Sequence, residues 1–246
     1  MRVYVDNQEI AEGRGNLSEG LGSVKIPLTI LTYNRPFYLD KTLDSFIRMN
    51  YDCLDSFYPI ILNQGTDEDT ELVVQDYSDF IKEYHKKENK GCAAGYSFIN
   101  SKYLSFPYLM HLQDDWYSTE PLSQYLDEIF RLFENNRNVG YIRLRSIHSR
   151  VCKRNRISTL PIEYKKWPKE DIFSNILVGN AHWTFNPTII RTEVLRKMLP
   201  VSKELDSMKK FHQLGMQSAQ LDANCFSHIG IDRALTNVKG KKVWIK

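Results

Sequence analysis

The sequence predicts an α/β protein with one mostly parallel central sheet flanked by helices, built as a single domain. Short apolar runs rich in β-branched residues alternate with stretches in which apolar residues recur at helical spacing. Such alternation is typical of parallel strands joined by crossover helices. The 246 residues contain no internal repeat and no linker that would separate two cores.

The composition restricts the class of protein. Apolar residues make up 42% of the chain, enough to bury a core, and 33 basic against 30 acidic side chains give a net charge of +3. This balance argues against a nucleic-acid-binding or membrane-surface protein. No apolar run approaches the about 20 residues that span a bilayer, and the polar N-terminus does not resemble a secretory signal. We therefore expect a cytoplasmic protein without a transmembrane segment.

The cysteines exclude two further classes of protein. They lie far apart and form no CxxC pair, at Cys53, Cys92, Cys152 and Cys225. This spacing argues against both a zinc knuckle and a disulfide scaffold.

The first predicted strand of the core follows a polar segment punctuated by glycines. We interpret residues 1–23 as an N-terminal extension or arm, with a short edge strand at Val3–Val5, and place the domain at 24–246. Residues 26–33 (IPLTILTY) predict a buried strand, because the run is apolar and β-branched. Pro36 fits the first turn of the next helix, whose apolar face comprises Leu39, Leu43, Phe46 and Ile47.

The same alternation continues to residue 112 and then becomes less regular. The predicted order is a strand over 58–63, a turn over 64–69, a helix over 72–84, a loop over 85–91, a helix over 92–104 and a strand over 108–112. Beyond it we expect helices near 122–133, 191–199 and 206–214, and a strand near 139–144. A basic stretch without periodicity lies between residues 146 and 170.

Polar residues follow three predicted strands at the point where each strand ends. They are Asn34-Arg35, Asn63-Gln64 and Asp114-Asp115. Because ligands of such sheets bind beyond the carboxyl ends of the strands, we expect a ligand site at this edge. Adjacent carboxylates there can hold a divalent cation and leave coordination positions for substrate phosphates. Alternatively, the two aspartates cap the next helix or face water.

Four segments, in this order, resemble the glycosyltransferases of the GT-A fold, most closely the large and mostly inverting family 2. They are LTILTYNRP, ILNQGTDEDT, NKGCAAGYSFINS and YLMHLQDDW, and a looser match, LDANCFSHIG, is similar to the family's C-terminal histidine segment. The resemblance implies a Rossmann-like central sheet, a nucleotide-sugar-binding half at 24–117 and an acceptor-binding half at 118–246. It also implies a divalent metal, Mn²⁺ or Mg²⁺.

The resemblance also implies roles for individual residues. Tyr33 stands where the family places an aromatic ring against the nucleotide base, and Asp114 would contact the ribose. Asp115 would ligate the metal, and His228 would contact the metal or the diphosphate, unless it is a buried histidine of the core. The residues expected to bind the donor nucleotide are Thr32, Tyr33, Asn34, Arg35, Asn63, Gln64, Lys90, Gly91, Gln113 and Asp114.

Three positions depart from the family pattern. Asn63 or Gln64 occupies the position of an aspartate that reads the base edge, and an amide both donates and accepts hydrogen bonds. Gln113 replaces the first acid of the DxD-type motif. The family often has an arginine where this chain has Ala94-Gly95-Tyr96-Ser97, so the charge would come from Lys90 or from the basic residues of 143–156.

An inverting transfer needs a general base beside the acceptor hydroxyl. In the resembled family this is a carboxylate ahead of a helix. The matching candidates are Asp206, preferred because MKKFHQLG follows it closely, then Glu204 and, less well placed, Asp171. Each can also be a solvated charge or a helix cap. On the acceptor side, Trp183 and Phe185 share one face if the chain is extended there, as sugar-stacking rings or as part of the core.

These observations predict a metal-dependent glycosyltransferase that moves a sugar from a nucleotide-sugar donor to a hydroxyl of a glycan or another acceptor, with inversion. Two alternatives are a nucleotidyltransferase, which shares the sheet and the carboxylate–metal chemistry, and a non-catalytic binding module of the same fold. Release of pyrophosphate instead of a nucleoside diphosphate would indicate the nucleotidyltransferase. Donor binding without turnover would indicate the binding module.

Overall fold

The computed structural model describes residues 1–5, 8–12, 25–145, 164–166, 176–179, 183–185, 187–230, 235–238 and 241–244. The strands of its main sheet are β1 (Arg2–Val5), β2 (Gln8–Glu12), β3 (Ile26–Thr32), β4 (Phe57–Asn63), β5 (Glu83–Lys86), β6 (Tyr108–Gln113), β8 (Val139–Arg143), β9 (Tyr164–Lys166), β10 (Ile176–Gly179), β11 (Thr188–Arg191) and β12 (Gln217–Leu221). The helices are α1 (Pro36–Met49), the 3₁₀-helix η1 (Tyr51–Ser56), α2 (Glu68–Asp76), α3 (Cys92–Ser101), α4 (Ser123–Asn135), α5 (Thr192–Met198) and α6 (Glu204–Gln213).

The described strands form an eleven-stranded sheet in the order β2-β1-β5-β4-β3-β6-β11-β8-β12-β10-β9. Eight of them, β1, β3, β4, β5, β6, β8, β9 and β12, run in one direction, and β2, β10 and β11 run in the other. The predicted α/β class with a mostly parallel central sheet is therefore confirmed. Two small sheets accompany it: β7 (Trp116–Ser118) with β13 (Phe226–His228), and β14 (Leu235–Val238) with β15 (Lys241–Trp244).

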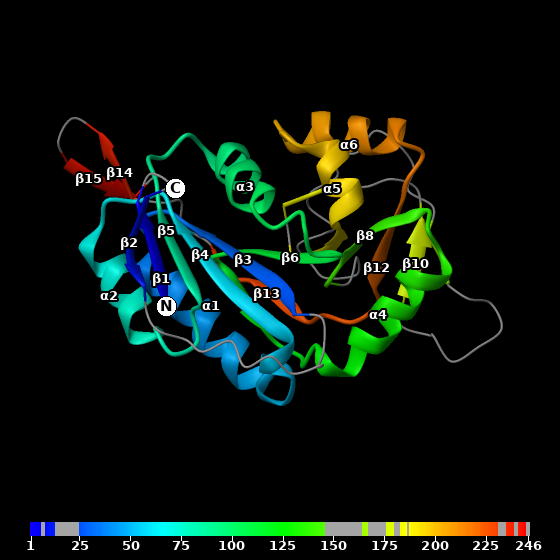
Figure 1. Ribbon diagram of the computed structural model, residues 1–246, viewed down its shortest axis with the longest axis horizontal. Helices are drawn as coiled ribbons and strands as arrows, with labels where there is room; N and C mark the ends of the chain where they lie inside the picture. Colours follow the sequence, from blue (N-terminus) through cyan, green and yellow to red (C-terminus); the bar gives the residue numbers. More distant parts are fainter. Residues whose placement is uncertain are drawn as a thin grey trace.

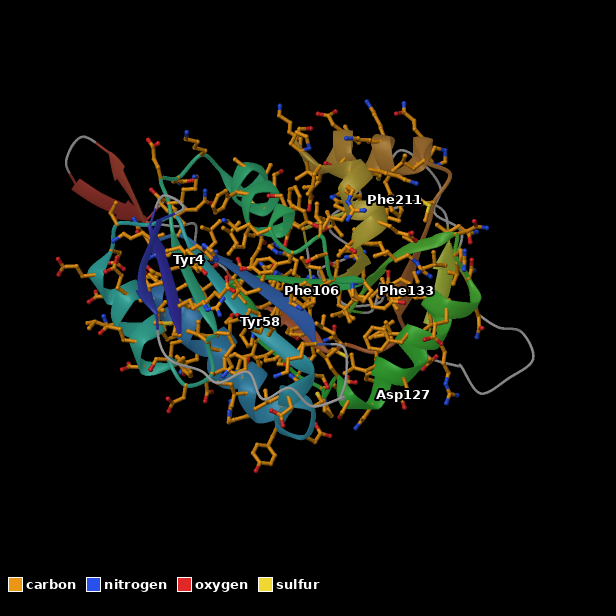
Figure 2. The ribbon with its side chains drawn as sticks, viewed as in Figure 1. Tyr4, Tyr58, Phe106, Asp127, Phe133 and Phe211 are labelled. Atoms are coloured by element: carbon orange, nitrogen blue, oxygen red, sulfur yellow. The ribbon has the colours of Figure 1, made fainter. Side chains whose placement is uncertain are left out.

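Helices cover the sheet on both faces. In Figure 1, α1, α2 and α4 lie below the sheet and α3, α5 and α6 lie above it. Two hydrophobic clusters match these layers, one with Phe133 of α4 and the other with Phe211 of α6, both labelled in Figure 2. Along β3, Ile30 belongs to the first cluster and Leu31 to the second, because successive side chains of a strand point to opposite faces. Burial on both faces explains why β3 is a continuous apolar run.

The side chain of Asn50 connects α1, β7 and the start of α4. It is fully buried after α1, and its Nδ2 donates to the Phe46 carbonyl at 2.9 Å and to Ser118 Oγ at 3.2 Å. Its Oδ1 accepts the Leu122 N–H at 2.8 Å, ahead of α4. One side chain thus satisfies backbone groups of α1 and of the start of α4, which fixes the segment that leaves β6.

Two predictions about the first half of the chain are wrong. The helix predicted over 72–84 ends at Asp76, and residues 83–86 form β5 instead. Tyr84 belongs to the α1–α4 cluster, whereas the ring of His85 packs against Phe98 of α3, so the two side chains lie on opposite faces. β5 is short and begins and ends with a charged residue, so the pattern of apolar residues does not indicate a strand there. The strand predicted at Val3–Val5 is present as β1, but it is not the edge strand, because β2 pairs outside it.

The other predicted helices and strands agree closely with α1, α3, α4, α5, α6, β3, β4, β6 and β8. The sequence did not predict the 3₁₀-helix η1 or the strands β2, β7 and β9 to β15. The basic stretch of 146–170 lies outside the described residues apart from β9. Among the described residues, no helix is long and apolar enough to cross a membrane.

His111 lies in the centre of β6 and is fully buried. Its Nδ1 is 2.9 Å from Thr29 Oγ1, and the Tyr96 ring meets it edge-on at 4.5 Å between centroids. Burial disfavours the charged imidazolium and lowers the pKa of His111 to about 3. We conclude that the folded protein holds this histidine neutral.

We therefore predict that His111 contributes to acid denaturation. Because its folded-state pKa lies below the ordinary value of about 6.5, the unfolded chain binds the proton first as the pH falls. Stability attributable to this group is present above about pH 6.5 and is lost toward pH 3, by at most about 1.4 kcal/mol per pH unit. Urea unfolding of the wild type and His111→Gln at several pH values should show this difference, with His212→Gln as the surface control. Parallel pH profiles for the wild type and His111→Gln would contradict it.

Candidate functional site

Parallel register brings the ends of four strands to one edge of the sheet. Thr32 of β3 pairs with Asn63 of β4, and Asn63 pairs in turn with Lys86 of β5. On the other side of β3, Leu31 pairs with Gln113 of β6. The segments that leave these strands therefore begin side by side, and they carry most of the residues predicted to bind a nucleotide.

Asp114 is buried directly after β6, and the end of β3 holds its carboxylate. Its Oδ2 accepts hydrogen bonds from Thr32 Oγ1 at 2.8 Å and from the Tyr33 backbone N–H at 3.4 Å. Its own backbone N–H donates to the Leu31 carbonyl at 3.1 Å, and its carbonyl accepts the Thr42 hydroxyl at 2.7 Å. These contacts fix both the main chain and the side chain of Asp114.

Asp115 faces the segment that follows β13. Its Oδ2 is 3.2 Å from His228 Nε2, and its carbonyl accepts the Ile229 N–H at 2.9 Å. A Cβ on Gly230 would lie only 2.4 Å from Oδ2, so this approach requires glycine. The other oxygen, Oδ1, is buried and has no hydrogen-bond partner among the described residues. His228 stays accessible, with 33% of its side chain exposed.

Arg35 bridges the two carboxylates. Its Nη1 donates to Asp115 Oδ2 at 2.8 Å and to Asp114 Oδ1 at 3.2 Å, and its guanidinium lies 4.5 Å from the Tyr38 ring centroid. The side chain is only 12% exposed. A single cation therefore neutralises part of a buried double negative charge.

The two carboxyls have opposite tendencies to ionise. Burial raises the pKa of Asp114 to about 7, although Arg35 opposes the shift. Burial also acts against ionisation of Asp115, but the hydrogen bond with His228 and the charge of Arg35 outweigh it and lower the pKa of Asp115. Asp115 is therefore the firmly anionic member of the pair, as a metal ligand has to be.

A cavity of about 360 Å³ opens at the same edge, beyond β3, β4 and β5. Its walls are Tyr33, Gln64, Gly65, Thr66, Lys86, Lys87, Glu88 and Asn89. Tyr33 and Gln64 were predicted from the sequence to bind the donor, whereas the four residues from Lys86 to Asn89 were not. Recognising β5 would have revealed them, since they then form a charged segment at the end of a strand.

The side-chain amides of Asn63 and Gln64 differ in whether they can contact a ligand in this cavity. Asn63 is fully buried, its Nδ2 donates to the Tyr84 hydroxyl at 3.0 Å, and its Oδ1 accepts the Gly65 N–H at 2.7 Å. Its amide is thus engaged at both ends within the protein. Gln64 lines the cavity and packs against α3, where a Cβ on Gly95 would approach Gln64 Oε1 to 2.4 Å. Of the two amides, Gln64 is placed to contact a ligand.

Asn34 connects the loop after β3 to the start of α2. Its Oδ1 accepts the N–H groups of Thr66 at 2.9 Å and Asp67 at 3.1 Å, and its backbone has a positive φ of 50°. A Cβ on Gly65 would meet this oxygen at 2.1 Å. The side chain of Asn34 therefore shapes the cavity wall.

Gln113 ends β6 directly before the acid pair and contacts the start of α3. Gln113 Nε2 donates to Cys92 Sγ at 3.0 Å, at the first residue of α3. Burial raises the pKa of the Cys92 thiol to about 11, and the negative charges of Glu204, Asp115 and Asp114 contribute to the shift.

The other acceptor-side candidates lie in different surroundings. Trp183 and Phe185 are buried in the cluster that includes Tyr96, as expected of core residues. The Phe185 backbone N–H donates to Glu204 Oε1 at 2.8 Å, which ties this segment to α6. Asp206 lies in the first turn of the same helix, and both Glu204 and Asp206 are exposed.

The basic candidates are spread around the edge. Lys90 is exposed and lies 3.9 Å from Glu88 Oε2, and Gly91 precedes α3 with a φ of 89°. Of the 143–156 stretch, the structure describes residues up to Arg145, which is buried with its guanidinium 4.9 Å from the Trp116 ring centroid. The remaining basic residues of that stretch, and Asp171, lie outside the described residues.

The sequence matches no family model and no curated protein. Solved structures resemble the fold. One is the mannosyltransferase PcManGT from Pyrobaculum calidifontis in complex with GDP-Man and Mn²⁺, with a TM-score of 0.56, 11% identity, and coverage of 79% of this chain and 53% of that one. Another is S. aureus TarS in complex with UDP-GlcNAc, with a TM-score of 0.55, 13% identity, and coverage of 84% and 61%.

A third similar structure is GalNAc-T7 with UDP, GalNAc and Mn²⁺, with a TM-score of 0.59, 11% identity, and coverage of 89% of this chain and 45% of that one. This chain thus spans less than two thirds of the length of each of these proteins. At sequence identities this low, the similarity shows a shared fold and does not show a shared activity. The chain has the GT-A fold of glycosyltransferases, as the resemblance of its sequence segments implied.

Proposed function

We propose that the protein is a metal-dependent glycosyltransferase that transfers a sugar from a nucleotide-sugar donor to an acceptor hydroxyl, with inversion. The observation that carries this proposal is the buried pair Asp114–Asp115 at the carboxyl end of β6, with one carboxylate oxygen unsatisfied among the described residues. A cavity suited to a nucleoside lies next to it at the same edge. PcManGT and TarS, whose fold this chain shares, bind GDP-Man and UDP-GlcNAc.

The residues present fit a divalent ion bound together with a diphosphate. Asp115 Oδ1 is a buried oxygen without a partner among the described residues, and His228 Nε2 lies beside the same carboxylate. Within the described part of the chain, no cluster of three or more His, Cys, Asp or Glu could hold a metal alone. Mg²⁺ and ions like it are commonly held by one or two carboxylates plus substrate phosphates. Such an ion would offset the charge that develops on the leaving diphosphate.

The proposed donor lies along the edge from the cavity to the acid pair. The base enters the cavity against Tyr33, where Gln64 and the ammonium groups of Lys86 and Lys87 can reach its polar edge. The ribose then meets Asp114, whose raised pKa suits a group that forms hydrogen bonds rather than binds metal. The diphosphate reaches Asp115, with Lys90, Gly91 and Gln113 along its path.

For the general base, the geometry favours Glu204 over Asp206. The Phe185 N–H donates to Glu204 Oε1 at 2.8 Å and fixes this carboxylate. In this assignment Trp183 and Phe185 do not contact the acceptor. Their buried side chains hold the segment that orients Glu204. An ionised carboxylate in this position could accept the proton of the attacking hydroxyl.

Loss of the anionic charge at residue 115 should abolish transfer. We predict that Asp115→Asn lowers release of nucleoside diphosphate from the donor sugar by about 100-fold or more, because the site loses its firmly ionised carboxylate. The measurement is product formation with Mn²⁺, and circular dichroism verifies the fold. Asp127→Asn is the matched control, since Asp127 lies exposed on α4 near the lower rim of the molecule in Figure 2.

The products of the same assay distinguish the alternatives. Release of pyrophosphate would replace the proposal with a nucleotidyltransferase. Donor binding without any product would indicate a non-catalytic binding module. An unchanged rate in Asp115→Asn would remove Asp115 from the chemistry.

The two candidate bases make different predictions. Glu204→Gln keeps an oxygen for the Phe185 N–H and removes the basic carboxylate, so we expect turnover to fall by about 10² to 10⁴ with the affinity for the nucleoside diphosphate unchanged. Asp206→Asn is the control on the same helical turn and should retain most of the activity. The reverse result, with Asp206→Asn inactive and Glu204→Gln active, would assign the base to Asp206.

A further inference from the structure

Arg35 contacts the same carboxylate, Asp115, on which the proposed function requires a metal ion. Its Nη1 lies 2.8 Å from Asp115 Oδ2 and 3.2 Å from Asp114 Oδ1, so one nitrogen bridges both carboxylates. The side chains of all three residues are largely buried, with exposed fractions of 12%, 9% and 4% for Arg35, Asp115 and Asp114. Charges at this separation and burial interact far more strongly than surface ion pairs do.

The backbone at Gly230 and the ring of His228 crowd the Oδ2 side of Asp115, where the guanidinium lies. A Cβ on Gly230 would approach Arg35 Nη2 to 2.5 Å and Asp115 Oδ2 to 2.4 Å, so the backbone closes over both groups. His228 Nε2 already lies 3.2 Å from Oδ2. A divalent ion on Asp115 would therefore sit next to a fixed positive charge, which lowers its affinity.

We propose that Arg35 is the counter-ion of the acid pair in the nucleotide-free protein and transfers its hydrogen bonds to the donor diphosphate when the nucleotide binds. The inference rests on the proposed function. A guanidinium presents several N–H donors in a planar fork that matches phosphate oxygens, so the diphosphate competes well with the carboxylates for Arg35. Departure of the guanidinium then frees Asp115 for the metal.

This arrangement couples two binding events. The metal binds weakly alone, because it must displace or tolerate Arg35, and binds tightly once the diphosphate has drawn Arg35 away. Coupling between two ligands is reciprocal, so the metal strengthens nucleotide binding by the same factor. The hydroxyl of Thr32 and the backbone of Tyr33 continue to hold Asp114 during the exchange, since their hydrogen bonds do not involve Arg35.

The test is a titration of the nucleotide-free protein with MnCl₂, in which electron paramagnetic resonance measures the concentration of free Mn²⁺ at each step. We expect Arg35→Gln to bind Mn²⁺ about tenfold more tightly than the wild type, because the competing charge is gone. Arg35→Lys retains a positive charge within reach and should bind Mn²⁺ like the wild type. The matched control is Arg48→Gln, which removes one charge from the exposed C-terminal end of α1, the helix that follows Arg35.

A second titration includes UDP or GDP. In the wild type the nucleotide should tighten Mn²⁺ binding, and in Arg35→Gln this enhancement should be about tenfold smaller. Equal or weaker Mn²⁺ affinity of Arg35→Gln without nucleotide would overturn the inference, and so would equal affinity of the Gln and Lys variants. If the wild type binds neither UDP nor GDP with Mn²⁺, the proposed function fails instead. The nucleotide-free titration still decides the role of Arg35.

Discussion

The rest of the site depends on one constraint, the burial of two adjacent carboxylates at the end of β6. Buried charge is costly unless hydrogen bonds and opposite charge compensate it. Here the compensation comes from three separate parts of the chain: Thr32 and Tyr33 at the end of β3, Arg35 ahead of α1, and His228 in β13. Only a fold that brings these segments together can keep Asp114 and Asp115 in place. A structure that keeps an otherwise costly pair is a strong indication of a functional site, although structural ion pairs also exist.

The sheet provides the geometry and the core provides the rigidity. Parallel pairing of β3 with β4 and β6 places the ends of these strands in register, so that the acid pair and the cavity share one edge. Helices on both faces fill the two clusters and leave that edge for the polar segments. Asn50 fixes the chain that leaves the acid pair by bonding to the end of α1 and the start of α4. The catalytic chemistry we propose thus takes place at the border of a rigid scaffold, where polar groups can meet solvent and ligand.

The features that depend on local pattern could be predicted from the sequence. β3, β4 and β6 are apolar runs that end in polar residues, and Pro36 starts α1 as expected. What long-range packing decides could not be predicted. β5 is four residues long and charged at both ends, so Lys86 and Lys87 were not recognised as part of the cavity. The bonds of Asn63 to the Tyr84 hydroxyl and the Gly65 N–H, and the contact of Glu204 with the Phe185 N–H, depend on how the segments meet in space.

The central claim is that the edge of the sheet binds a nucleoside diphosphate together with a divalent ion. The most direct measurement is the thermal unfolding of the wild-type protein with UDP, GDP and their sugar conjugates, with and without Mn²⁺ or Mg²⁺. A ligand that binds only the folded protein, present at about 100 times its dissociation constant, adds about 2.7 kcal/mol of stability. Our account predicts stabilisation by one nucleotide class that requires the metal. The absence of any shift across the panel, with or without metal, would contradict it.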